Sequence, residues 1–121
     1  MTSQTILIVE DDPFLRETMG EALREHDVIV DQTSNGEEAI EYLKSHTPDL
    51  LLLDLLMPRK DGYAVLHHLK EVNSSLPVLI LSNLSDYLDH EKCLKLGARD
   101  YLIKSDMDAD DLWPKIQPYL S

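Results

Sequence analysis

The side chains with the richest chemistry in this 121-residue chain end or follow short apolar segments: Glu10, Asp11, Asp12, Asp54, Ser82 and Lys104. Neighbouring parallel strands would gather these side chains in one place. Two carboxylates about 4 Å apart repel by about 1 kcal/mol in water and by about 4 kcal/mol at an effective dielectric constant of 20. Folding stabilises a domain by only about 5–15 kcal/mol, so such a cluster of acids favours a bound divalent cation.

The candidate metal ligands are oxygen donors, with no cysteine or histidine among them. This set favours Mg²⁺, which takes one or two carboxylates and keeps several waters. Mg²⁺ and Lys104 together would balance the charges of Glu10, Asp11 and Asp54, leaving a neutral pocket suited to a phosphoryl group. An aspartate held there can form an acyl phosphate. The pattern predicts a magnesium-dependent phosphoryl site, and the alternative is a set of solvated loop charges.

Five short apolar runs must position these side chains, and we expect them to be strands: Thr5–Val9, Asp27–Asp31, Asp49–Asp54, Pro77–Ser82 and Asp100–Ile103. Most of them lack the alternation of apolar and polar residues that marks a strand with one wet face. Continuous apolar runs are typical of parallel strands that are covered on both faces.

A helical periodicity follows each run, and start or stop residues frame four of these helices: Pro13, Asn35, Asp61 and Gly97. Asp12 is expected to help cap the first helix. The fifth and clearest amphipathic stretch covers residues 112–120, with Pro114 in its first turns. A strand and a helix therefore alternate five times, which predicts an α/β fold with a doubly wound parallel sheet of five strands. Its ligand site should lie beyond the carboxyl ends of the strands.

Composition narrows the class of protein. The chain has 11 Lys+Arg against 23 Asp+Glu, a net charge of −12, which disfavours direct binding to nucleic acid or to an anionic membrane. The single cysteine, Cys93, excludes a disulfide framework, fits a reducing compartment and is expected to be a small buried hydrophobe. No apolar stretch approaches the roughly 20 residues that span a bilayer. We expect one cytoplasmic domain over residues 1–121.

Three weaker signals carry no function. The acids between Asp106 and Asp111 resemble the start of a calcium loop but lack its glycine and its final glutamate, so they are expected to favour the start of the last helix. The neighbouring His67 and His68 do not have the spacing of metal ligands on a helix. The four glycines are too far apart for a nucleotide-binding loop.

Several runs resemble the receiver domain of two-component response regulators: VEDDP (9–13), DLLMPRKDG (54–62), and LS (81–82) followed by GARDYLIK (97–104). The resemblance covers essentially the whole chain. It implies the flavodoxin-like strand order 2-1-3-4-5. It also implies a phosphorylation-activated signalling switch that is not a turnover enzyme, with at most self-phosphorylation and self-dephosphorylation activity.

The resemblance assigns roles to the metal pocket. Asp54 matches the aspartate that accepts the phosphoryl group. Asp11 matches the direct Mg²⁺ ligand, and Glu10 its neighbour that acts through water. The backbone carbonyl of Leu56 matches the remaining protein ligand.

The resemblance also assigns the residues that respond to phosphorylation. Lys104 matches the lysine that contacts the phosphoryl group, and Ser82 matches the switch hydroxyl that engages it. Tyr101 matches the aromatic residue whose rotation accompanies the switch.

The implied partners are a histidine kinase or a His-phosphotransfer protein as donor, and a downstream protein bound in trans. That protein would dock on the face formed by the fourth helix, the fifth strand and the fifth helix. The chain would be a monomer or a phosphorylation-dependent dimer, with no output domain of its own. Two alternatives are a receiver-like module that does not use phosphorylation and a Mg²⁺-dependent aspartyl phosphatase. The phosphatase would need a second acid where this chain has Leu56.

The chain departs from the family pattern near the pocket. Ser105 follows Lys104, where the family commonly has a proline joined by a cis bond; the sequence leaves a cis or a trans bond open here. Leu56, Asn83 and Leu84 are neighbours that would affect attacking water, so the lifetime of the phosphoryl group is not predicted.

Overall fold

The computed structural model describes residues 3–57, 59–83 and 87–120, which form one five-stranded parallel sheet in the order β2-β1-β3-β4-β5. The strands are β1 (Thr5–Val9), β2 (Ile29–Thr33), β3 (Leu50–Leu53), β4 (Val78–Ser82) and β5 (Asp100–Ile103). The helices are α1 (Pro13–Arg24), α2 (Gly36–Leu43), α3 (Gly62–Glu71), α4 (Tyr87–Lys95) and α5 (Leu112–Ile116). This confirms the predicted fold class and strand order.

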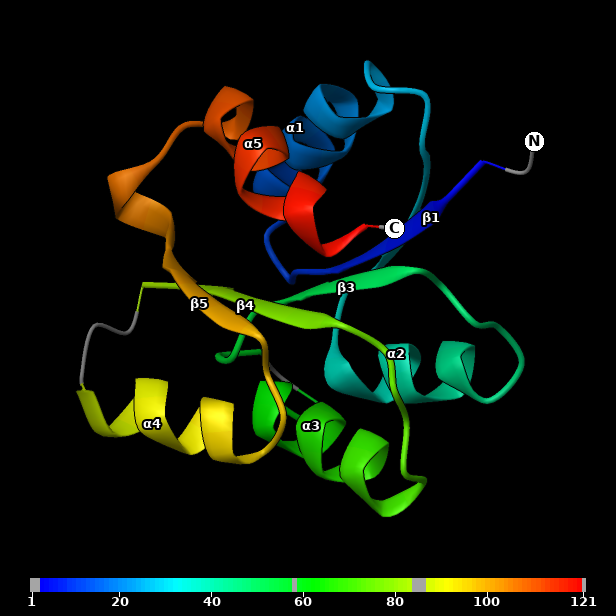
Figure 1. Cartoon of the computed structure of the whole chain (residues 1–121), viewed down its shortest axis with the longest axis vertical. Helices are drawn as coiled ribbons and strands as arrows, with labels where there is room; N and C mark the ends of the chain where they lie inside the picture. The colour runs from blue at the N-terminus through cyan, green and yellow to red at the C-terminus, as the bar shows by residue number, and fades with distance from the viewer. Residues whose placement is uncertain (1–2, 58, 84–86, 121) are drawn as a thin grey trace.

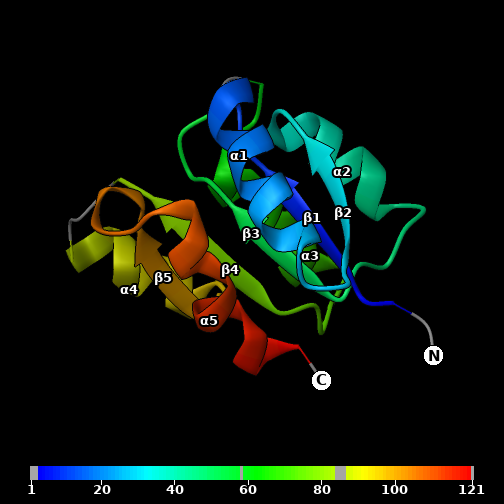
Figure 2. The same ribbon diagram turned by 90° about the horizontal axis from the view of Figure 1, so that it is seen from above.

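Helices cover both faces of the sheet. Helices α1 and α5 lie on one face, and α2, α3 and α4 lie on the other (Figure 1). Figure 2 looks onto the layer that contains α1 and α5. The carboxyl ends of all five strands therefore meet at one edge of the sheet, between the two helical layers.

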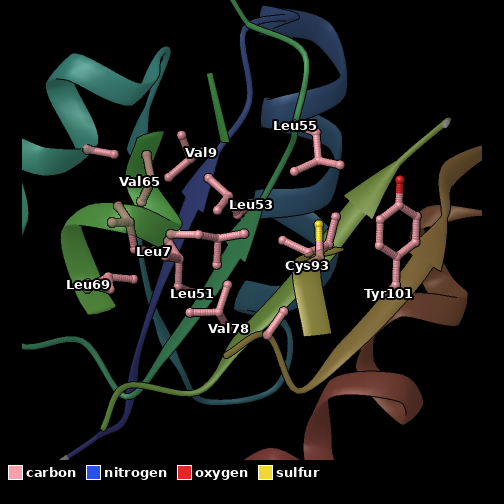
Figure 3. Close-up of a cluster of buried hydrophobic side chains, with 14 residues drawn as sticks. Leu7, Val9, Leu51, Leu53, Leu55, Val65, Leu69, Val78, Cys93 and Tyr101 are labelled. Atoms are coloured by element: carbon pink, nitrogen blue, oxygen red, sulfur yellow. The ribbon is translucent and has the colours of Figure 1, made fainter. Parts of the chain in front are cut away.

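Two apolar cores fill the space between sheet and helices. Alternate residues of β1 face opposite cores: Leu7 and Val9 join the core beneath α2, α3 and α4, whereas Ile6 and Ile8 join the core beneath α1 and α5. Figure 3 shows the first of these cores, which includes the fully buried Cys93. The continuous apolar runs are thus explained by burial on both faces, as predicted.

Strand β2 differs from the prediction in position and in burial. It spans 29–33 in place of 27–31, and Ile29 is 51% exposed. Asp27 has a φ of 59°, a left-handed conformation that a strand does not contain. Because β2 lies at the edge of the sheet, its pairing with β1 sets its position more strongly than apolar content does.

The fifth helix is shorter than predicted. Helix α5 ends at Ile116, and a tight 3₁₀ turn over Gln117–Tyr119 takes the place of the end of the expected helix; another such turn, Ala109–Asp111, precedes α5. Pro118 has no N–H to continue the helical hydrogen bonds, so the last turn tightens. The acidic stretch before α5 caps the preceding 3₁₀ turn and not α5 itself: the backbone N–H of Asp108 donates a hydrogen bond to the side chain of Asp111 at 2.9 Å.

The other helix boundaries follow the predicted signals. Asp12 caps α1 by accepting hydrogen bonds from the N–H groups of Phe14 and Leu15. Asn35 and Asp61 cap α2 and α3 in the same way. None of the helices in the described ranges is long and apolar enough to cross a membrane.

Candidate functional site

Three carboxylates meet at the carboxyl ends of β1 and β3. Oxygen atoms of Glu10, Asp11 and Asp54 all lie within 4.8 Å of one another. The two strands are neighbours in the sheet, and the N–H of Asp54 donates to the carbonyl of Val9 at 3.1 Å. Glu10 is 1% exposed and Asp54 is 6% exposed, whereas Asp11 is open to solvent. The cluster can hold a divalent cation that enters from the side of Asp11.

Lys104 supplies the positive charge that balances this cluster. Its ammonium group forms an ion pair with Glu10 and lies 3.2 Å from Oδ2 of Asp54. The lysine starts from the end of β5, two strands away from β3. The strand order therefore brings together residues that are far apart in the sequence, as predicted.

Burial and charge shift the protonation of this pair. Burial raises the pKa of Glu10 to about 7, because its charged form loses solvation; the neighbouring Asp54 adds to this effect, and Lys104 opposes it. Burial alone would lower the pKa of Lys104, but contact with Glu10 and Asp54 outweighs it and raises that pKa. Lys104 is thus a fixed cation, while Glu10 can hold a proton near neutral pH when no metal is bound.

Arg16 is a site residue that the sequence patterns did not indicate. Its guanidinium donates a hydrogen bond to the backbone carbonyl of Glu10 at 2.8 Å. This contact fixes the turn that presents Glu10 and Asp11 to the cluster. Arg16 is one helical turn after Asp12, so its reach to the strand end depends on the direction of α1, which sequence spacing does not define.

Ser82 and Tyr101 form a second part of the site. Ser82 ends β4 and is 1% exposed, and Tyr101 in β5 is 9% exposed. Burial raises the pKa of Tyr101 to about 12, and a side-chain hydrogen bond to Ser82 partly opposes this shift. In Figure 3 the Tyr101 hydroxyl points toward the same end of the sheet as the arrowhead of β4. The predicted switch residues are therefore in contact.

The loop between β3 and α3, which follows Asp54, is hydrogen-bonded to the start of α2. Its carbonyls at Arg59 and Lys60 accept hydrogen bonds from the first N–H groups of α2, at 3.0 and 2.9 Å. At Gly62, an added Cβ would lie 2.4 Å from the carbonyl oxygen of Asp54. Leu56 lies in this loop with its side chain 60% exposed. Glycine at 62 lets the start of α3 approach the phosphoacceptor candidate.

The loop after β5 is joined to the loop after β4. Among the described residues no peptide bond is cis, so the Lys104–Ser105 bond is trans. The N–H of Ser105 donates to the side chain of Asn83 at 3.0 Å. Leu84, which the sequence singled out beside Asn83, lies outside the described residues.

Comparison with known families identifies the class of this site. The family model of the response regulator receiver domain matches residues 6–117. The chain belongs to this family. Receiver domains are phosphorylation-activated signalling switches of two-component systems, mainly switches rather than catalytic enzymes, and they generally use Mg²⁺ at an acidic pocket.

Sequence relatives cover most of this receiver domain. The chemotaxis protein CheY of Halobacterium salinarum is 31% identical over 102 residues, which cover 84% of this chain and 85% of that protein. A probable transcriptional regulator, ycf27, of Cyanidium caldarium is 38% identical over 99 residues, which cover 82% of this chain but only 39% of the regulator.

Solved receiver structures have the same fold. The BeF3-activated N-terminal receiver domain of Klebsiella pneumoniae RstA has a TM-score of 0.87 and 30% identity, covering 96% of this chain and 97% of that one. The receiver domain of the Francisella response regulator 1452 has a TM-score of 0.89 and 26% identity, covering 97% and 96% of the two chains.

Proposed function

We propose that this receiver domain accepts a phosphoryl group on Asp54, from a histidine kinase or a His-phosphotransfer protein, with Mg²⁺ as cofactor. One observation carries the proposal: Glu10, Asp11 and Asp54 converge within 4.8 Å, and the Lys104 ammonium lies 3.2 Å from the Asp54 carboxylate. This arrangement provides a nucleophile, a cation site and a fixed positive charge in one pocket.

The metal ligands of the proposal are the carboxylates of Asp11 and Asp54 and the backbone carbonyl of Leu56, with Glu10 acting through water. When bound, Mg²⁺ would neutralise charge on the phosphoryl oxygens. The all-oxygen donor set fits this ion. The exposed position of Asp11 leaves room for the waters that Mg²⁺ keeps.

In the transfer step, a carboxylate oxygen of Asp54 attacks the phosphorus atom of a phosphohistidine. A P–O bond forms while the P–N bond breaks, and the electron pair of that bond returns to the imidazole of the donor. Lys104 can release its contact with the Asp54 oxygen and pair with a phosphoryl oxygen. The neutralised pocket then holds an acyl phosphate.

The response to phosphorylation is proposed to pass through Ser82 and Tyr101. Their hydrogen bond competes with any contact between the Ser82 hydroxyl and a phosphoryl oxygen. A change at Ser82 therefore alters the environment of Tyr101 and the face formed by α4, β5 and α5. A downstream protein would bind that face.

The test is phosphorylation by acetyl phosphate with Mg²⁺, followed by intact-mass measurement. We expect the wild-type chain to gain one phosphoryl mass, Asp54→Asn to gain none, and omission of Mg²⁺ to abolish the gain. Asp110→Asn, which changes an exposed acid before α5, is the matched control and should behave like wild type. Retention of the added mass in Asp54→Asn would overturn the assignment of the phosphoacceptor.

A further inference from the structure

A second aromatic ring covers Tyr101. The imidazole of His90, in α4, stacks on the Tyr101 ring with the centroids 3.8 Å apart and the planes 21° from parallel. Tyr101 also has a side-chain hydrogen bond with Ser82. The buried Tyr101 therefore contacts one residue of β4 and one residue of α4.

The His90 ring has two opposing effects on that position. Stacking of the two rings favours the buried state of Tyr101. However, Nε2 of His90 is buried and has no hydrogen-bond partner among the described residues. A buried polar atom without a partner disfavours the state in which it is buried, and this cost offsets part of the gain from the aromatic pair.

The residues around His90 fix the helix that carries it. Asp89 accepts a hydrogen bond from the hydroxyl of Tyr63 in α3 at 2.5 Å. The ammonium of Lys92 lies 4.1 Å from the centroid of the same Tyr63 ring. These contacts hold α4 against α3, so the place of His90 does not depend on Tyr101 alone.

We propose that His90 is a positioning residue that keeps Tyr101 poised between its buried position and an exposed one. Stacking holds Tyr101 inward, and the unpaired Nε2 weakens that hold. A change at Ser82 then has only a small preference to overcome. The contact between His90 and Tyr101 does not depend on the proposed function, whereas its role in signalling rests on that function.

Two variants of His90 separate the opposing effects. His90→Phe keeps a ring to stack on Tyr101 and removes the unpaired nitrogen, whereas His90→Ala removes both. The readout is hydroxyl-radical footprinting of the full chain without a phosphodonor, with oxidation of Tyr101 located by peptide mass spectrometry. An aromatic pair corresponds to about two- to tenfold in an equilibrium constant.

We expect Tyr101 oxidation to rise in His90→Ala, by less than the roughly two- to tenfold of a full aromatic pair, and to fall below the wild-type level in His90→Phe. The matched control is His46→Ala, which removes a similar stack on Tyr42, with centroids 4.2 Å apart, and should leave Tyr101 unchanged. Shifts of both variants in the same direction, or no shift in either, would overturn the proposal. If His90→Ala fails to fold by circular dichroism, an unchanged or raised signal in His90→Phe is sufficient to reject it.

A second arm repeats the footprinting with Mg²⁺ and beryllofluoride, the phosphoryl mimic named in the RstA structure. We expect the mimic to change Tyr101 oxidation less in His90→Phe than in wild type, because the ring is held more firmly. Opposite shifts of the two variants without the mimic, together with no phosphoryl gain at Asp54, would reject the proposed function and support the role of His90. Normal phosphorylation of Asp54, together with equal Tyr101 oxidation in wild type and in both His90 variants, would support the proposed function and reject the role of His90.

Discussion

Glu10 shows how a single residue can serve the pocket and also destabilise it. It is 1% exposed, its carboxylate pairs with Lys104, and its Oε2 accepts a hydrogen bond from the N–H of Asp11 at 3.0 Å. A carboxyl group in such a buried site keeps its proton to a higher pH than an exposed carboxyl group does. The stability of the metal-free chain should therefore depend on pH through this residue.

We expect the free energy of unfolding of the metal-free wild type, relative to Glu10→Gln, to decrease between about pH 5 and pH 8. In the folded chain the pKa of Glu10 is raised to about 7 from an ordinary value of 4.5. The unfolded chain thus binds fewer protons across this window, so stability falls as the pH rises. Each unit of pKa corresponds to about 1.4 kcal/mol, so the change should amount to a few kcal/mol at most.

Urea unfolding in the presence of a chelator, at several pH values, measures this difference. The Glu10→Gln variant lacks the titrating group, so its curve is the reference. Parallel pH dependences of the two proteins would show that Glu10 is not the group responsible.

Sequence reasoning was most effective for residues at strand ends and least effective for residues that reach them from the sides. The carboxyl ends of parallel strands lie at one edge of the sheet, which brings together Glu10, Asp54 and Lys104. This rule can be applied from the positions of the strands in the sequence. Arg16 and His90 make their contacts from helices. The angle at which a helix crosses the sheet is a product of packing, so neither contact was visible in the sequence.

At the scale of elements, two glycines do different physical work. Gly62 sits where a Cβ would meet the Asp54 carbonyl oxygen at 2.4 Å, although its φ is not left-handed. Gly97 has a φ of 103° at the end of α4, and nothing lies within 4 Å of an added Cβ. Gly62 is required because a side chain would not fit, and Gly97 is required because its φ is left-handed.

We expect Gly62→Ala to destabilise the chain by about 1–3 kcal/mol, because overpacking displaces the backbone beside Asp54. It should also slow phosphorylation by acetyl phosphate. Gly97→Ala should cost about 1 kcal/mol through backbone strain and leave the phosphorylation rate unchanged. Chemical denaturation and initial rates of mass gain measure both, and an equal loss of rate in the two variants would contradict this division.

The elements that deviated from their prediction have clear physical reasons. β2 extends to Thr33 because Thr33 pairs with Val9 at the edge of the sheet, where the apolar content of a strand is a weak guide. α5 is short because Pro118 interrupts a stretch whose apolar spacing still fits a helix; Leu112 and Ile116 are buried as that spacing predicts. For α5 the burial pattern was informative and the boundary was not, whereas for β2 neither was.

For the molecule as a whole, cation binding should increase the free energy of unfolding. A ligand that binds only the folded state at 100 times its dissociation constant adds about 2.7 kcal/mol. We expect Mg²⁺ to raise the melting temperature of wild type, to have little effect on Asp11→Asn, and to have its full effect on Asp110→Asn. Scanning calorimetry measures this, and an equal rise in all three proteins would place the bound ion elsewhere.

Trp113 is a poor reporter of that binding. It stacks on His26 with centroids 4.5 Å apart and planes within 3°, between the end of α1 and α5. It packs against the core beneath α1 and α5. Calorimetry therefore suits the metal measurement better than tryptophan fluorescence.

The ion pair between Glu10 and Lys104 joins residues that are 94 positions apart. As a ribosome makes the chain, the acids of β1 and β3 emerge first, and their neutralising lysine emerges only with the last strand. Until β5 pairs with β4, the acidic edge has no internal counter-charge of this kind, and its repulsion opposes closure of the half-made sheet. The pocket therefore gains its lysine only when β5 joins the sheet, after the four strands that precede β5 in the chain have been made.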